Sequence, residues 1–339
     1  MRTIKLLLST LSILPIVAAA QSSAPMMKAI VVHEYGGPEV LRLEDVPVPT
    51  PKENEILVKV FAAGVNSFDG VLRSGKYAKI FKMQLPWIPG YDVVGTVEKV
   101  GGKVSKLKVG DPVYAFISIP SGGGYADYAL AKESQVALKP ATISFVEAAG
   151  VPSVALTAWQ ALVDKANVQP GQTVLIHGAS GGVGMFAIPI AKIRGAKVFA
   201  TASTANQDFL KQLGADVAID YKTQKFEEVA KDVDVVVDGV GGDTLARSYS
   251  IVKKGGFVVS LVARVDQAQL DNHGIHGVSL EAESNGDELA QIGKLIDEKK
   301  IKVVVSETFP LADAAKAEAK ADTGHARGKI VLKVRDEPK

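Results

Sequence analysis

The stretch "TVLIHGASGGVGMFAIPIAKIRGAKVFATAS", residues 173–203, decides the fold of the second half of the chain. Residues 173–177 are an apolar run typical of a buried strand, and residues 178–184 are rich in glycine. Residues 183–194 show helical periodicity, and residues 197–202 are a second apolar run. This order of strand, tight turn, helix and strand predicts a βαβ unit that binds a dinucleotide.

The glycines of this turn have distinct predicted roles. Gly181 and Gly182 allow the backbone to approach a pyrophosphate at a helix N-terminus, whose N–H groups bind anions. Gly184 allows the helix to lie close to the strand, and Ala179 takes the first glycine position of the G-x-G-x-x-G pattern. The predicted phosphate-binding residues are Ala179, Ser180, Gly181, Gly182, Val183 and Gly184.

Further apolar runs follow the βαβ unit, most of them separated by helical stretches. They are "VAID" (217–220), "DVVVD" (234–238), "GFVVSLV" (256–262) and "GVSLEA" (277–282). Strands that are apolar along their whole length are typical of a parallel sheet covered on both faces. The sequence therefore predicts an α/β protein with a doubly wound, parallel Rossmann sheet.

The end of the second strand favours NADPH over NADH. An enzyme that selects NAD usually has Asp or Glu there to bind the ribose hydroxyls, but residues 201–204 are "TAST" and the first acid is Asp208. Ser203 can donate to a 2′-phosphate, and Tyr221 and Lys222 are further candidate partners. Alternatively, Ser203 caps the next helix and Lys222 is a surface charge. No Arg stands at this strand end, so the positive partner stays open.

Residues 27–152 have a different character. They combine short alternating strands with many Gly and Pro residues and little helix. Residues 55–66 and 93–101 are typical of β-ribbons, and residues 107–116 contain a Gly-Asp turn before a strand. The sequence predicts a compact β-barrel-type domain before the nucleotide-binding domain.

Several motifs, in this order, resemble one protein family: "GGPEVL" (36–41), "AAGVNSFDGVLRSGKY" (62–77), "WIPGYDVVGTVEKVG" (87–101), "LKVGDPVY" (107–114), "LTAWQAL" (156–162), "GASGGVG" (178–184), "LGADVAIDY" (213–221) and "GHARGKIVL" (324–332). The chain resembles the zinc-independent quinone oxidoreductase and alkenal/enone reductase branch of the medium-chain dehydrogenases/reductases. The resemblance implies a GroES-like catalytic domain over 27–152, a Rossmann NADP-binding domain over 153–282, and a return to the catalytic domain over 283–336. It also implies a homodimer, because the strand at 277–282 often pairs across a subunit interface in relatives.

The sequence predicts that no metal is bound. The zinc-containing relatives hold a catalytic zinc with Cys, His and Cys, and the matching positions here are Asn66, Tyr91 and Ser153. The chain has no Cys for a structural zinc site. His273 and His276 are expected in a polar loop without a third ligand.

The resemblance also implies roles for individual residues. Asn66 lies beside the nicotinamide, and Asp69 orients its loop or serves a structural role. Tyr77 donates to the oxygen of a developing enolate or packs the cleft wall. A second family tyrosine is replaced by Val71, which puts the quinone-specific pocket in doubt. Thr157 meets the nicotinamide side of the cofactor or starts a helix, and Lys329 approaches the cofactor or is a surface lysine.

These residues together predict an NADPH-dependent reductase that transfers hydride to a quinone or an α,β-unsaturated carbonyl without zinc. The alternative is a nucleotide-binding protein of the same fold with little turnover. The near balance of 39 Lys and Arg against 37 Asp and Glu argues against a nucleic-acid partner. Residues 335–339 are expected to be a solvated tail.

Residues 1–20 have the three parts of a secretory signal peptide. Arg2 and Lys5 form the positive region, residues 6–17 are apolar, and Ala18 to Ala20 supply the cleavage site. The apolar run is too short to span a membrane. The sequence predicts export and a mature start near Gln21. The alternative is a cytoplasmic protein that starts at Met26 or Met27.

Overall fold

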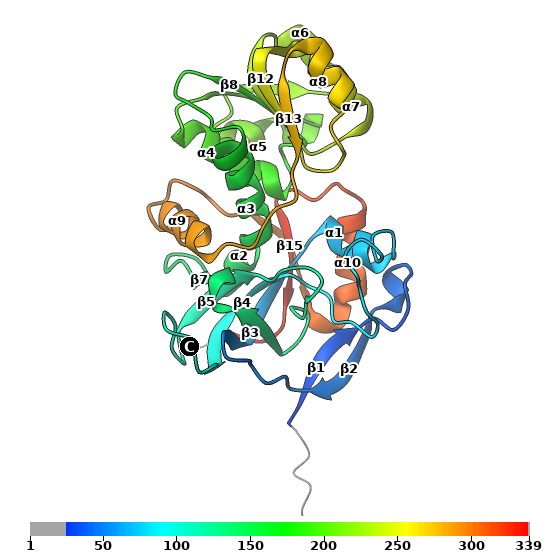
Figure 1. The fold of residues 1–339 in the computed structure, drawn as a ribbon, viewed down its shortest axis with the longest axis vertical. Helices are drawn as coiled ribbons and strands as arrows, with labels where there is room; N and C mark the ends of the chain where they lie inside the picture. The colour runs from blue at the N-terminus through cyan, green and yellow to red at the C-terminus, as the bar shows by residue number, and fades with distance from the viewer. Residues whose placement is uncertain (1–24, 338–339) are drawn as a thin grey trace, which may run out of the picture.

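The computed structural model describes residues 25–337, so the predicted signal peptide at 1–20 lies outside the described residues. Two domains are stacked along the long axis of the molecule, with the six-stranded sheet in one and the seven-stranded sheet in the other (Figure 1). None of the helices in the described part is long and apolar enough to cross a lipid bilayer.

The nucleotide-binding domain is built on a parallel six-stranded sheet. Its strands are β8 (Thr173–His177), β9 (Lys197–Ala202), β10 (Val217–Asp220), β11 (Val233–Asp238), β12 (Val252–Ser260) and β13 (His276–Ser279). The spatial order β10-β9-β8-β11-β12-β13 corresponds to 3-2-1-4-5-6 along the chain, the order of a dinucleotide-binding Rossmann fold. The predicted fold class is confirmed.

Both faces of this sheet are buried, which explains why its strands are apolar throughout. In β8, Val174 and Ile176 belong to the core shared with α4, whereas Leu175 belongs to a second core on the opposite face. Phe226 of α6 and Leu245 of α7 join that second core. The helices of this domain are α4 (Gly182–Ile193), α5 (Gln207–Gln212), α6 (Phe226–Val229), α7 (Gly242–Ser248) and α8 (Gln267–His273).

The other domain contains a mostly antiparallel seven-stranded sheet and a separate hairpin of β1 (Met26–Val31) and β2 (Arg42–Pro47). The sheet consists of β3 (Glu55–Val65), β4 (Asp92–Val100), β5 (Pro112–Phe116), β6 (Tyr128–Lys132), β7 (Val136–Leu138), β14 (Val305–Pro310) and β15 (Lys329–Lys333). The last two strands come from the end of the chain, and β15 pairs with β3. The chain therefore returns to this domain after the Rossmann sheet (Figure 1).

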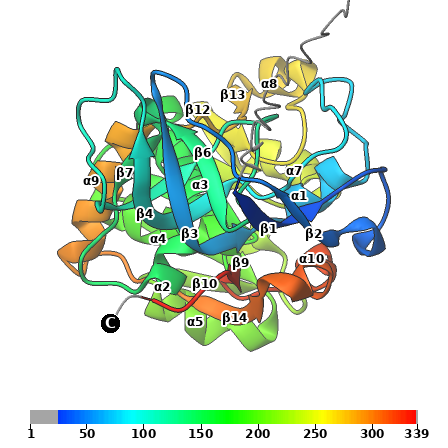
Figure 2. The same cartoon turned by 90° about the horizontal axis from the view of Figure 1, so that it is seen from below.

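The remaining helices surround this sheet or join the domains. They are α1 (Ser67–Arg73), α2 (Phe145–Ala149), α3 (Pro152–Trp159), α9 (Gly286–Asp297) and α10 (Ala314–Asp322), and a π-helical turn over Gln160–Lys165 continues α3. Short 3-10 turns cover Pro38–Val40, Glu133–Gln135, Thr204–Asn206, Tyr249–Ile251 and Leu311–Asp313. Viewed from below, α9 lies beside β7 and α10 lies beside β14 (Figure 2). Helix α3 lies at the junction and contacts α4 of the nucleotide-binding domain.

Two local predictions are wrong. Arg335 is not part of a solvated tail, because its Nε donates to the Val60 carbonyl at 2.7 Å and its Nη2 donates to the Asp127 carbonyl at 2.8 Å. The two histidines expected in a polar loop lie instead on regular elements, His273 on α8 and His276 on β13. Arg335 is more than two hundred residues away from Val60 and Asp127 in the sequence, so local pattern alone could not predict these contacts.

Candidate functional site

The glycine-rich turn follows β8 and leads directly into α4. Gly178 has a φ of +68°, a left-handed conformation that glycine adopts without strain, and Gly181 precedes the first residue of α4. A Cβ at Gly184 would lie 2.3 Å from the Ala179 carbonyl oxygen, so only glycine permits this approach of helix to turn. The first N–H groups of α4 have no partner within the helix.

These features fit the pyrophosphate of a dinucleotide. Ser180, Gly181 and Gly182 are partly exposed, so the turn at the N-terminus of α4 is partly open to solvent. A Cβ at Gly182 would lie 3.0 Å from both Val154 Cγ1 and Lys329 Cδ, so a larger residue would crowd the turn. The turn supplies backbone donors and a positive helix end, which bind phosphate groups.

The edge of the sheet beyond β9 carries the residues predicted to select the cofactor. Ser203 is partly exposed, and its hydroxyl accepts a hydrogen bond from Asn206 Nδ2 at 3.2 Å. The same amide group lies 3.3 Å from the hydroxyl of Ser180 in the glycine-rich turn. Tyr221 and Lys222 are exposed, and the Tyr221 N–H donates to the Ala202 carbonyl at 3.3 Å. Both therefore lie beside the end of β9.

Sequence reasoning missed one cation at this edge, Arg327. It comes from the loop between α10 and β15, and its Nε donates to Asn206 Oδ1 at 2.9 Å. Arg327 lies in the same "GHARGKIVL" motif as Lys329. Its place in this motif is the only sign in the sequence that could have pointed to it. Its position beside β9 follows from the tertiary fold, since the two segments are more than a hundred residues apart.

A buried polar cluster lies where four elements meet. Asn66 precedes α1, Asp92 begins β4, Ser153 lies in the first turn of α3, and Lys329 begins β15. Lys329 is 3% exposed, and its Nζ donates to Asn66 Oδ1 at 2.6 Å and to the Val65 carbonyl at 2.9 Å. Burial therefore excludes the alternative that Lys329 is a surface lysine.

Asp92 links the members of this cluster, and sequence reasoning did not single it out. Its carboxylate accepts from the Ser153 N–H at 2.7 Å, the Ser153 hydroxyl at 2.6 Å and Asn66 Nδ2 at 2.9 Å. Lys329 Nζ lies 3.4 Å from the same carboxylate. A fully buried carboxylate needs such donors, because burial without partners is costly.

Two of the three positions predicted to replace zinc ligands come together. The Ser153 hydroxyl, which donates to Asp92, also lies 3.1 Å from Asn66 Oδ1. The third, Tyr91, is buried and packs against Trp87 with ring centroids 6.4 Å apart. Within residues 25–337, no three His, Asp or Glu side chains are grouped so as to hold a metal ion.

Asp69 holds the loop that carries Asn66. Its Oδ2 accepts from the Asn66 N–H at 2.8 Å and from the Tyr125 hydroxyl at 2.8 Å. Burial raises the pKa of Asp69 to about 7, although the two hydrogen bonds from Asn66 and Tyr125 act in the opposite direction. On α10, burial and the charge of Asp69 raise the pKa of Glu318 to about 8.

Tyr77 lies apart from this hydrogen-bonded cluster, whereas Thr157 contacts it through the backbone of Ser153. Tyr77 packs in an aromatic group with Phe68 and Phe81, each with ring centroids 6.2 Å from its own. Its hydroxyl makes no hydrogen bond within the described part of the chain. The Thr157 hydroxyl donates to the Ser153 carbonyl at 2.7 Å, and Thr157 is one of the few partly exposed residues of α3. The predicted roles of these two residues stay predictions.

The glycine-rich turn and the polar cluster are joined by two consecutive residues. The Gly328 N–H donates to the Ser180 carbonyl at 2.9 Å, and Lys329 follows with its bond to Asn66. The start of β15 thus brings the predicted nucleotide turn against the predicted catalytic residues.

Comparison with known proteins matches both domains. Residues 52–141 match the alcohol dehydrogenase GroES-like domain, and residues 213–332 match the zinc-binding dehydrogenase family. The chain is 39% identical to the NADPH-dependent alkenal/one oxidoreductase, chloroplastic, of Arabidopsis thaliana, over 92% of this chain and 81% of the relative. The chain belongs to the quinone oxidoreductase and alkenal/one oxidoreductase family of medium-chain dehydrogenases/reductases.

Other members of this family agree in length and fold. The quinone oxidoreductase of Mus musculus is 35% identical, over 91% of this chain and 98% of its own. The structure of the quinone oxidoreductase from Coxiella burnetii superimposes with a TM-score of 0.86 at 38% identity, covering 92% of this chain and 100% of that one. The predicted resemblance is confirmed.

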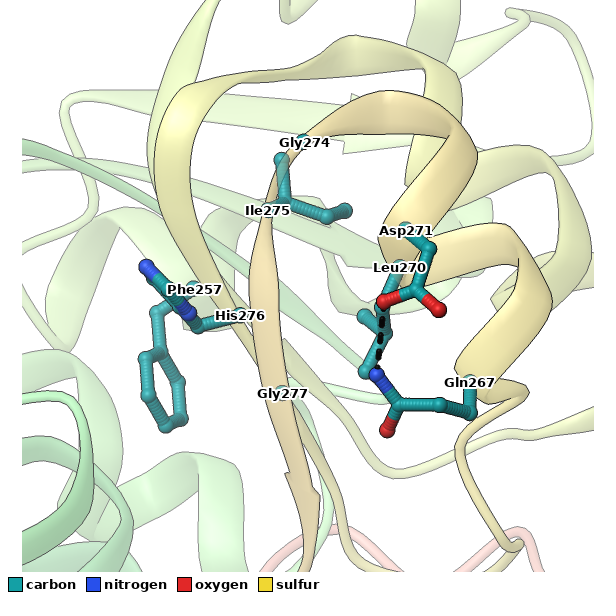
Figure 3. A pocket seen from close by; sticks show the side chains of 8 residues that line it. All are labelled: Phe257, Gln267, Leu270, Asp271, Gly274, Ile275, His276 and Gly277. Atoms are coloured by element: carbon teal, nitrogen blue, oxygen red, sulfur yellow. Dashed lines mark hydrogen bonds between the residues drawn. The ribbon is translucent and has the colours of Figure 1, made fainter.

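A separate pocket lies at the outer edge of the Rossmann sheet, between α8 and β13 (Figure 3). Gln267 and Asp271 of α8 line it and hydrogen-bond to each other at 2.9 Å, and His276 lies on the opposite side. None of the predicted site residues lines this pocket. It is therefore distinct from the candidate site at the domain junction.

Proposed function

We propose that the protein is an NADPH-dependent reductase that transfers hydride to a quinone or an α,β-unsaturated carbonyl compound. One observation carries this proposal: a glycine-rich turn that fits a dinucleotide adjoins a buried polar cluster that contains Asn66 and Ser153, two residues expected to replace zinc ligands. The names of the relatives, an alkenal/one oxidoreductase and quinone oxidoreductases, support the same acceptors.

The residues of the site suit hydride transfer to a quinone or an enone. The nicotinamide cofactor, when bound, supplies the hydride. A quinone or enone is already electrophilic, so the protein needs only to orient it and to stabilise negative charge on its oxygen. The Tyr77 hydroxyl has no partner among residues 25–337 and is available to donate to that oxygen. Asn66, held by Asp69 and Lys329, fixes the adjacent loop.

The test is cofactor oxidation by the form that begins at Gln21. The rate with NADPH is compared with the rate with NADH, and each cofactor is tested with three acceptors: a simple quinone, a 2-alkenal and a cyclic enone. We expect NADPH-dependent turnover with at least one acceptor class. Tyr77→Phe should lower kcat about tenfold or more, because it removes a donor to the transition state. Tyr128→Phe, on β6, is the matched control and should keep wild-type turnover.

The alternative function gives a different result. A binding protein of this fold would bind NADPH but oxidise it with none of the acceptors. That outcome would contradict the reductase proposal and favour the nucleotide-binding protein.

We also infer a homodimer. Strand β13 is the outer strand of the Rossmann sheet among the described residues, and His276 and Ser279 on it are exposed. An open strand edge can pair with a second copy of the same strand. Light scattering coupled to size-exclusion chromatography tests this inference, and a monomer mass at micromolar concentration would contradict it.

We further propose that residues 1–20 direct export by the general secretory route. The order of positive, apolar and small residues supports this proposal. Mass spectrometry of the N-terminus in the producing cell tests it. A mature start near Gln21 outside the cytoplasm is expected, whereas full-length protein confined to the cytoplasm would contradict export.

A further inference from the structure

The loop that follows α1, residues 74–86, carries positive charge that no acid neutralises. Lys76, Lys79 and Lys82 are all exposed, and no carboxylate within residues 25–337 forms an ion pair with any of them. The sequence contains no Asp or Glu between Asp69 and Asp92. The loop therefore presents three unpaired ammonium groups to solvent.

A second lysine-rich loop of the same domain, between β4 and β5, is different. Two of its three lysines have acidic partners: Lys103 pairs with Glu53 at 2.7 Å, and Lys106 pairs with Asp287 at 3.4 Å. The third is Lys108. A cluster of lysines in this protein is thus not left unpaired everywhere, and the loop after α1 stands out by its lack of partners.

Apolar side chains are exposed beside these lysines. Ile80 is 67% exposed, the largest value among the large hydrophobic residues in the described part of the chain. Phe68, in the first turn of α1, is 38% exposed, and its ring centroid lies 5.9 Å from that of Phe81. Tyr35 is 37% exposed, and its ring packs against Gly75. One exposed apolar residue is ordinary, but three gathered among unpaired lysines indicate an interaction surface.

The inner side of the loop is anchored to the domain. The Phe81 N–H donates to the Tyr77 carbonyl at 3.0 Å, and the Met83 N–H donates to the Ala78 carbonyl at 2.9 Å. Tyr77, Phe81 and Met83 pack against the main hydrophobic core. The lysines, spaced three residues apart, and Ile80 are therefore held on the outer side.

This outer side suits a lipid surface better than a protein partner. A specific protein interface usually needs about 1,000 Å² of buried surface with a matching shape. An anionic bilayer needs only positive charge and an apolar side chain that can enter the headgroup region. Exposed tyrosines are also typical of the boundary between a membrane and water, and Tyr35 is in that position here.

We propose that the loop of residues 74–86 docks on a membrane surface that contains anionic lipids, with Ile80 among the headgroups and the three lysines at the lipid phosphates. The same loop carries Tyr77, which the proposed function places beside the acceptor. Docking brings that part of the protein to a bilayer, where apolar quinones and long-chain enals concentrate. The docking goes beyond the proposed function and is testable without turnover.

The test measures sedimentation with lipid vesicles. The form from Gln21 is mixed with vesicles of phosphatidylcholine, either alone or with phosphatidylglycerol added. Wild type should sediment with the anionic vesicles at low salt and be released by about 1 M salt, which shortens the Debye length to about 3 Å.

Two variants separate the contributions of charge and apolar surface. The triple variant Lys76→Gln, Lys79→Gln, Lys82→Gln should partition about a hundredfold more weakly, because each lysine near an anionic surface contributes about fivefold. Ile80→Ser should partition about tenfold more weakly, because it loses the apolar side chain that enters the headgroup region.

Each variant has a matched control. The triple variant Lys103→Gln, Lys106→Gln, Lys108→Gln changes the net charge equally in the loop between β4 and β5 and should sediment like wild type. Leu43→Ser, on β2, changes another exposed apolar residue and should also sediment like wild type.

The outcomes separate this inference from the proposed function. Wild type that stays in solution with anionic vesicles at low salt would overturn the inference and leave the reductase proposal intact. Equal loss of sedimentation in the two triple variants would also overturn it, because net charge alone would then govern binding. Sedimentation of a protein that oxidises NADPH with none of the acceptors would contradict only the reductase proposal.

Discussion

At the residue scale, the most unusual group in the site is Asp69. It is buried, and its Oδ1 has no hydrogen-bond partner in the described part of the molecule. Its pKa is raised to about 7, mainly by burial; Lys329 lowers this pKa and Asp92 raises it more weakly. Because the pKa is higher in the folded state than in the unfolded chain, the folded state binds this proton more tightly.

This raised pKa predicts the pH dependence of stability. The contribution of Asp69 to the free energy of unfolding is fully present below about pH 4 and is lost as the pH rises through about 7. Asp69→Asn mimics the protonated acid and still accepts from Asn66 and Tyr125. Relative to wild type, its free energy of unfolding should therefore rise by at least about 1.4 kcal/mol between pH 5 and pH 8, the equivalent of one pKa unit.

Urea unfolding at both pH values measures this difference. Asp45→Asn, on the exposed strand β2, is the control for the substitution itself. A constant difference between Asp69→Asn and wild type across this range would show that Asp69 is ionised throughout.

At the element scale, the contact between α4 and the turn after β8 depends on one missing side chain. A Cβ at Gly184 would meet the Ala179 oxygen at 2.3 Å and its Cα at 2.4 Å, and both are backbone atoms that cannot rotate away. Helix α4 would have to move outward, and the N–H groups that it presents to a phosphate would move with it.

Gly184→Ala should therefore reduce both stability and nucleotide affinity. We expect a loss of about 2 kcal/mol in the free energy of unfolding, typical of overpacking. NADPH affinity should fall at least about tenfold. Gly102→Ala is the matched control, since a Cβ there meets no atom within 4 Å. Equal effects of the two substitutions in thermal unfolding and titration would refute this account.

At the scale of the whole molecule, Lys329 connects three parts of the chain. Its ammonium bonds the end of β3 and Asn66 and lies near Asp92, while the residue before it bonds the glycine-rich turn. Removing this charge would leave the buried Asp92 carboxylate without its nearest cation. Breaking a buried pair from one side is far more costly than replacing both partners.

Lys329→Met should destabilise the protein by about 3 kcal/mol. The double variant Lys329→Met with Asp92→Asn should be more stable than the sum of the single effects predicts, because it also removes the unpaired charge. Lys333→Met, at the exposed end of the same strand, should cost less than about 1 kcal/mol. Additive effects in denaturant unfolding would show that Lys329 and Asp92 do not interact.

The sequence by itself determined the strands, turns and helices whose pattern depends on residues close together in the chain. The apolar runs, the glycine-rich turn and the helix after it identify β8, α4 and β9, because strand burial and tight turns leave a local pattern. Strand β13 was expected at 277–282 and lies at His276–Ser279, since element ends are set by contacts rather than by composition. The motifs also predict that Asn66 and Ser153 replace zinc ligands, and this assignment stays a prediction.

Only the tertiary structure decided which distant residues share the site. Asp92 and Arg327 lie within family motifs, but their contacts are with groups far away in sequence, Ser153 for one and Asn206 for the other. Burial likewise distinguishes Lys329 from a surface lysine and gives Asp69 its raised pKa. A local pattern records which face of an element is buried, whereas charge pairing and desolvation depend on which elements meet at the domain junction.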